Sequence, residues 1–168
     1  MSFSEIKYDE ISGNIFDRVG RQWMLITGGG EARFNTMTAS WGGAGILWGK
    51  PVAFCFIRPQ RYTYEFVENG EFFTLSFYGE EHRAALLLCG SKSGRDLDKA
   101  REAGLTPRVS DAGAVYFGEA ELALVCRKIY SDDLKPERFL SPDIAAVYPG
   151  RDYHRMYIGE ILQVLKKD

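Results

Sequence analysis

The ten residues from Phe34 to Gly43 bring chemically unlike side chains together in one short stretch. They provide hydroxyls, a carboxamide, a thioether and an indole, and they end in two glycines. Polar groups suit the edge and chain of a ligand, apolar groups suit its ring faces, and glycine lets backbone approach closely. The mixture therefore predicts a site for a flat, amphipathic, phosphorylated ligand. The candidate contacts are Asn35, Thr36, Met37, Thr38, Ala39, Ser40 and Trp41.

A second candidate segment runs from Arg58 to Thr63, with the sequence Arg-Pro-Gln-Arg-Tyr-Thr. It leaves a predicted buried strand and enters a predicted helix, so backbone amides, a hydroxyl and the guanidinium groups of Arg58 and Arg61 can converge on an anion. Thr63 can serve as a helix cap or as a phosphate donor. The alternative for this segment is a solvated pair of arginines.

A third segment, from Cys89 to Lys99, is a loop that enters another predicted helix and is rich in hydrogen-bond donors. Two structural roles compete with ligand contact here. Ser93 or Asp96 can cap the helix, and Lys99 can pair with a neighbouring aspartate on the helix surface. Capping and ligand contact are compatible, so both stay open.

Several common kinds of site are absent from the sequence. The glycines after the first predicted strand lack the Gly-x-Gly-x-x-Gly spacing of a dinucleotide site, and Gly49-Lys50 is followed by proline rather than the Ser or Thr of a P-loop. There is no Gly-x-Ser-x-Gly nucleophile motif. With only His82 and His154, a histidine-rich metal site is excluded, and we predict no metal. For His154 we favour a structural role over a reactive one.

Composition narrows the class of protein further. With 168 residues, 45% of them hydrophobic, the chain is the size of one domain, which we assign to residues 1–168. Its 21 basic and 23 acidic residues include no long basic run, so we expect no nucleic-acid partner. We find neither a membrane span nor a signal peptide, and we expect a cytoplasmic protein. The three cysteines are far apart in sequence, so we expect inert packing.

Aromatic content of 14% and short apolar runs broken by glycine or proline favour a mainly β fold with short helices. The predicted strands cover 23–27, 34–41, 51–57, 72–78, 120–130 and 153–165. The predicted helices cover 61–68, 81–88 and 97–103. We expect Asn69-Gly70 to end the first helix in the left-handed conformation.

Taken together and in this order, the three segments resemble the flavoredoxin branch of the flavin reductase-like family. The resemblance also covers Leu47-Trp48, Lys50-Pro51-Val52 and Tyr157-Ile158-Gly159-Glu160-Ile161. It implies an FMN-binding split β-barrel, a homodimer, and a flavin cleft near the subunit interface. By position, residues 35–41 would line the isoalloxazine ring and ribityl chain. Arg58, Arg61, Tyr62 and Thr63 would hold the phosphate, and Ser93, Gly94, Arg95 and Lys99 would close over it.

The resemblance implies an oxidoreductase that takes a hydride from NADH or NADPH and passes electrons through FMN to a flavin or a protein acceptor. Two alternatives stay open: a flavoredoxin-like carrier with no nicotinamide site of its own, and a split-barrel protein that binds a ligand without redox chemistry. Many flavin reductases carry adjacent Asp and His before the last strand, whereas Tyr153 separates Asp152 from His154 here. We keep His154 as the candidate catalytic residue.

Overall fold

The computed structural model describes residues 2–168 and shows a mainly antiparallel β fold with short helices, as predicted. The strands are β1 (Phe3–Ile6), β2 (Met24–Gly30), β3 (Arg33–Ala39), β4 (Gly42–Leu47), β5 (Lys50–Ile57), β6 (Phe72–Phe77), β7 (Pro107–Val109), β8 (Val115–Phe117), β9 (Leu122–Asp133) and β10 (Arg155–Lys167). The α-helices are α1 (Tyr62–Asn69), α2 (Arg83–Ser91), α3 (Lys99–Glu102) and α4 (Pro142–Ala145). Single turns of other helix types lie at Tyr8–Glu10, Asp17–Gln22, Glu80–His82 and Pro136–Arg138. Within residues 2–168, no helix has the length and hydropathy needed to span a membrane.

One large sheet has the strand order β3-β2-β6-β9-β10-β5-β4, with β1 added beside β10. Strands β3 and β4 therefore lie at opposite ends of this order, yet only Ser40 and Trp41 separate them in sequence. Three residue steps from Ala39 to Gly42 span at most ~11 Å, so the sheet must curl until its two edges approach each other. Ser40 and Trp41 lie at this opening of the curled sheet.

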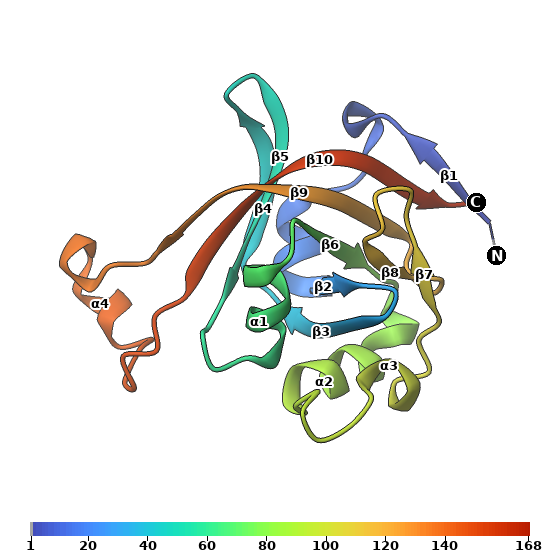
Figure 1. The fold of residues 1–168 in the computed structure, drawn as a ribbon. Helices are drawn as coiled ribbons and strands as arrows, with labels where there is room; N and C mark the ends of the chain where they lie inside the picture. Colours follow the sequence, from blue (N-terminus) through green and yellow to red (C-terminus); the bar gives the residue numbers. More distant parts are fainter. Residues whose placement is uncertain (1) are drawn as a thin grey trace.

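The two longest strands, β9 and β10, form the frame of the fold (Figure 1). Strand β10 pairs with β5 through its first half and with β1 through its last residues, while β9 runs beside it throughout. The register of this pair shifts between Ile158 and Gly159. A Cβ at Gly159 would lie 2.6 Å from the Cβ of Cys126 and 2.7 Å from the ring of Phe73, so only glycine fits this crossing.

The core lies inside the curled sheet, where β2, β6 and β9 contribute fully buried apolar side chains such as Ile26, Leu75 and Leu124. All three cysteines are buried and free, as expected from inert packing. Burial raises the pKa of the Cys55 and Cys126 thiols and raises that of Cys89 to about 11. Helices α2 and α3 cover the outer side of β3 and seal a second, smaller apolar cluster around Leu86 (Figure 1).

Two details of the helices differ from prediction. Gly70 ends α1 with φ of −90°, an extended conformation, so the expected left-handed ending is wrong. Glycine is required there for another reason, since a Cβ would lie 2.7 Å from the carbonyl oxygen of Phe66. The predicted helix over 97–103 is shorter, and Asp98 caps it by accepting from the Arg101 amide at 3.1 Å. Neither Ser93 nor Asp96 caps that helix.

Residues 134–154 form an arm that projects from the barrel between β9 and β10 and carries α4 (Figure 1). Apart from α4 and the turn at Pro136–Arg138, this proline-containing stretch is irregular. Arg58 ties the arm back to the barrel, because its guanidinium pairs with Asp152 and donates to the Val147 carbonyl at 3.3 Å. The same guanidinium lies over the ring of Tyr148.

Candidate functional site

Strand β3 places the first candidate segment at an edge of the sheet. One side of β3 pairs with β2, and the other side faces α2 and α3 instead of a further strand. Its outward backbone groups therefore need partners from elsewhere, and Lys99 Nζ supplies one by donating to the Thr36 carbonyl at 2.9 Å. The same ammonium donates to the Cys89 carbonyl at 2.8 Å. Lys99 thus joins β3 to the end of α2.

The three candidate segments converge around this point. The Asn35 carboxamide donates to Thr63 Oγ1 at 2.7 Å, which links the first segment to the second. Arg61 donates to the Gly90 carbonyl at 2.9 Å, which links the second to the third. Gly94 lies so close to Asn35 that a Cβ would come within 1.8 Å of the carboxamide oxygen. The convergence that the resemblance implied is therefore present in the fold.

Two cations, Lys99 and Arg61, lie at this convergence. Lys99 is only 5% exposed, and burial, followed by the nearby charge of Arg61, lowers its pKa to about 8. Burial, followed by the charge of Arg58, also lowers the pKa of Arg61. Within residues 2–168, the partners of both groups are backbone carbonyls, and neither forms an ion pair with a carboxylate. Because buried charge is costly unless compensated, this pair fits an anion supplied from outside the chain.

A cavity of about 230 Å³ adjoins these groups. Asn35, Thr36, Gly94 and Lys99 line it, together with Arg33, Asp98 and the apolar residues around them. Asp98 is turned to cap α3, where its carboxylate accepts from the Arg101 amide. The predicted surface pairing of Lys99 with a neighbouring aspartate is wrong, because its side chain is buried beneath β3 and α2 rather than exposed on α3.

Some of the remaining residues of the first segment pack in the core, and others lie at the opening between β3 and β4. The side chain of Met37 packs in the main core cluster, so only its backbone faces the predicted site. Thr38 donates its hydroxyl to the Leu86 carbonyl and fastens α2 to β3. Ala39 packs against the core, and Ser40 follows at the opening between β3 and β4. Trp41 is 44% exposed there and presents an accessible indole.

Side chains from the second and third segments form the outer wall of the site. Arg95 lies 4.6 Å above the ring of Tyr62, pairs with Glu65, and donates to the Gln60 carbonyl. The Ser93 hydroxyl accepts from the Arg95 amide at 3.2 Å, which shapes the loop that carries Gly94. This arrangement holds the third segment against the first turn of α1. Arg58 instead faces the arm, where Asp152 and Tyr148 engage its guanidinium.

His154 is buried on the arm side of the opening. Its Nδ1 is joined to the Tyr148 hydroxyl by a hydrogen bond of 2.9 Å, and its ring centroid lies 4.8 Å from that of Trp41. Burial, followed by the charge of Arg58, lowers its pKa to about 4, although Asp152 works in the opposite direction. The imidazole is therefore neutral at pH 7, and its ring packs against the indole of Trp41. Sequence reasoning missed Tyr148, because an irregular stretch carries no periodic signal for such a contact.

Comparison with known proteins agrees with this geometry. Residues 16–168 match the family described as flavin reductase like domain. The chain belongs to this family. No protein of curated function gives a match.

Solved structures share the split-barrel fold of this flavin reductase-like domain. An FMN-binding protein from Thermus thermophilus is 17% identical with a TM-score of 0.71, over 97% of this chain and 81% of that one. The FMN-binding domain of a flavin reductase-like enzyme from Shewanella baltica OS155 is 15% identical with a TM-score of 0.71, over 98% and 77%. A flavoredoxin of Desulfovibrio vulgaris (Miyazaki F) is 24% identical with a TM-score of 0.68, over 87% and 69%.

The two cations at the convergence, Arg61 and Lys99, lead to a test with inorganic phosphate. We expect phosphate to raise the thermal midpoint relative to chloride at matched ionic strength, because a ligand that binds only the folded state stabilises it. The shift should be largest near pH 7 and smaller near pH 9, since Lys99, with a pKa of about 8, loses its charge between these values.

Thermal unfolding of three proteins checks this expectation. Lys99→Met should abolish the phosphate shift, while Lys166→Met, which removes an exposed cation on β10, should retain it. An equal shift at both pH values, or a full shift in Lys99→Met, would show that phosphate binds elsewhere.

Proposed function

We propose that this domain binds FMN and acts as a flavin reductase that takes electrons from NADH or NADPH. The observation that carries the proposal is that two cations beside the polar edge of β3, Arg61 and Lys99, have no carboxylate partner among residues 2–168. Family membership and the FMN-binding proteins of the same fold support FMN as the phosphorylated ligand. The electron acceptor is a second flavin or a redox protein.

The phosphate end would lie between Lys99 and the first turn of α1. Arg61 stands at the N-terminal boundary of α1, and the amides of Tyr62 and Thr63 have no partners inside the helix because they precede its first hydrogen bond. Fixed amides and cations suit a phosphate dianion. Thr63, held by Asn35 at 2.7 Å, would add a hydroxyl. Arg58 would act only through its charge at longer range, because its guanidinium is already paired with Asp152 of the arm.

The ring end would lie along the outward edge of β3 toward Trp41. Backbone groups and hydroxyls from Thr36 to Ser40 would meet its polar edge, and the exposed indole would meet a ring face. Bound FMN would supply the hydride and electron chemistry. The chain's own tasks would be to orient the ring and to leave one face open. His154, neutral at pH 7, would hold the indole in place through ring contact.

The first test of the proposal is the binding of FMN itself. We expect the purified protein to bind FMN, and Arg61→Ala to weaken binding by about 1.5–3 kcal/mol, the usual worth of a hydrogen bond to a charged group. Fluorescence titration measures both affinities. The matched control is Arg101→Ala, which removes an exposed arginine that pairs with Glu102 on α3.

The outcomes of this titration are distinct. An unchanged affinity of Arg61→Ala for FMN would show that Arg61 does not bind the phosphate. A colourless wild-type protein that takes up no added FMN would contradict FMN as the ligand. It would favour the alternative of a split-barrel protein that binds another ligand.

A second test separates a reductase from a carrier. We expect NADH or NADPH to reduce the bound FMN faster than it reduces free FMN, because a reductase orients donor and acceptor. Stopped-flow absorbance of the FMN-loaded protein with each donor measures these rates. Bound FMN that is reduced no faster than free FMN would contradict the reductase and favour a flavoredoxin-like electron carrier.

We also propose that the domain is a homodimer through the β4–β5 hairpin. The hairpin turns through Trp48 and Gly49, with φ of 52° and 71°, a left-handed pair that a bulky residue seldom adopts. Trp48 and Ile46 are each 64% exposed there, and the Trp48 ring lies 6.2 Å from that of Tyr130. Exposed aromatic clusters of this kind favour an interface.

Light scattering tests the dimer. We expect twice the mass of one chain for the wild type and the mass of one chain for Ile46→Lys, because a lysine at the centre of an apolar interface must lose its hydration. Val109→Lys, which adds the same charge to an exposed site on β7, should remain dimeric. A wild-type protein with the mass of a single chain would contradict the dimer.

A further inference from the structure

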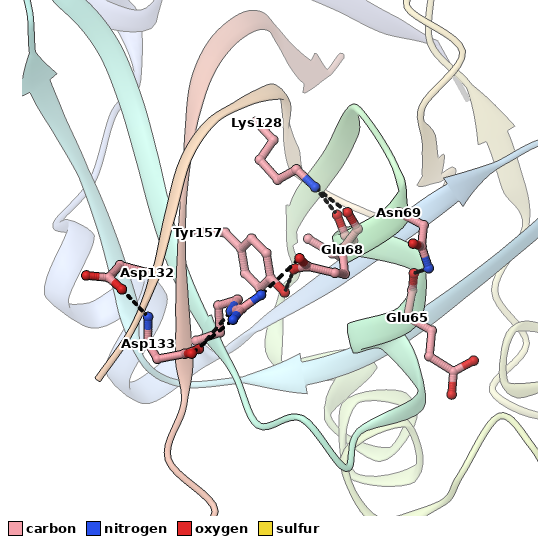
Figure 2. A network of polar contacts seen from close by, with 9 residues as sticks. Glu65, Glu68, Asn69, Lys128, Asp132, Asp133 and Tyr157 are labelled. Carbon is pink, nitrogen blue, oxygen red and sulfur yellow. Dashed lines mark hydrogen bonds and ion pairs between the residues drawn. The ribbon is translucent and has the colours of Figure 1, made fainter. Parts of the chain in front are cut away.

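A polar network fastens the end of α1 that lies away from the proposed phosphate site (Figure 2). Lys128 on β9 directs its ammonium to the last turn of the helix, donating to the Val67 carbonyl at 2.8 Å and to the Glu68 carbonyl at 2.6 Å. These carbonyls have no partners within the helix, so the lysine acts as a C-terminal cap and complements the negative end of the helix dipole. Burial lowers the pKa of Lys128, and Glu68 opposes that shift.

The Glu68 carboxylate is held from β10. Its Oε2 accepts from the Tyr157 hydroxyl at 2.6 Å, and its Oε1 accepts from Arg155 at 2.9 Å. Arg155 uses its other nitrogens on the two oxygens of Asp133, at 2.7 and 2.9 Å. Burial works to raise the pKa of Glu68, but the bonds from Tyr157 and Arg155 outweigh it and lower the pKa. The carboxylate is therefore charged and held in one orientation.

These contacts constrain α1 in two independent ways. Lys128 holds main-chain carbonyls of the last turn from β9, and Tyr157 and Arg155 hold the Glu68 side chain from β10, in addition to the packing of α1 on β2 and β3. An eight-residue helix is about 12 Å long and moves as one body, so constraints at its last turn set the position of its first turn. That first turn carries Thr63 and follows directly on Arg61. In some proteins, buried ionic groups contribute to conformational specificity more than to stability.

We infer that Lys128, Glu68 and Tyr157 are positioning residues for the phosphate end of the ligand site. The inference rests on the proposed function, because it takes FMN as the ligand. The network touches neither the cavity nor β3 and acts through the placement of α1 alone. It therefore affects recognition of the phosphate and leaves recognition of the ring unchanged.

Comparison of FMN with riboflavin tests this inference, because riboflavin has the same ring and chain without the phosphate. For Lys128→Met and Tyr157→Phe we expect the Kd for FMN to rise about 2- to 30-fold, the range measured for residues that act through a network. The Kd for riboflavin should stay within the error of the measurement. The matched control is Arg127→Met, which alters the preceding residue on β9, where the side chain pairs with Glu160 away from α1. It should change neither Kd.

Each outcome decides a separate point. An equal loss of affinity for both ligands would show that the network merely supports the fold, and an unchanged Kd for FMN in both variants would also overturn the inference. Wild-type protein that binds FMN no better than riboflavin would instead overturn the proposed phosphate site. If Lys128→Met fails to fold, Tyr157→Phe carries the test, because it removes one hydroxyl and keeps the buried ring.

Discussion

The candidate site depends on one buried cation. Lys99 reaches from α3 under the outward edge of β3 and bonds the carbonyls of Thr36 and Cys89, so one ammonium holds the strand and two helices together. Burial, followed by the charge of Arg61, lowers the pKa of Lys99 to about 8, so the charged form is less favourable here than in water. Arg61 adds a second positive charge instead of relieving the first. Such an arrangement is favourable chiefly when an anion completes it, which links the packing of the fold directly to ligand binding.

The opening in the sheet gives that anion a place. A fully closed barrel would pair the edge of β3 with β4, and the backbone groups of residues 35–39 would then bond to another strand. Here β3 and β4 meet only through Ser40 and Trp41, so the edge is covered by helices and side chains. The side chains that satisfy this edge, Asn35 and Lys99 among them, are also those that line the cavity. The topology of the sheet thus produces the polar groups of the site.

Local patterns in the sequence predicted six of the strands, and the family resemblance implied the convergence of the three segments. The glycine turn after the first predicted strand placed residues 34–41 on a returning strand, and the strand-to-helix step after Ile57 placed Arg61 and Thr63 at a helix start. Strand β4 was missed because its glycines have little strand propensity, and pairing with β5 alone makes it a strand.

Contacts between distant residues explain the remaining differences. Arg58 is 94 residues from Asp152, and no local sequence pattern predicts that the arm folds back onto Arg58. The core position of Met37 depends on which face of β3 turns inward, and the buried position of Lys99 depends on how α2 and α3 pack. The single domain, the cytoplasmic location and the catalytic role of His154 stay predictions.

The charges around α1 show why the two ends of this helix need different partners. A helix has a positive N-terminal end, so Arg61 at that boundary is electrostatically unfavourable in the protein alone. The opposite end is already compensated, since Lys128 meets its carbonyls and Arg155 neutralises Glu68. Among residues 2–168, Arg61 and Lys99 have only carbonyl partners, and both lie toward the N-terminal end of the helix. Glu65 in the first turn of α1 is already paired with Arg95, so it does not compensate Arg61 or Lys99, and anion binding is the simplest physical explanation of these two cations.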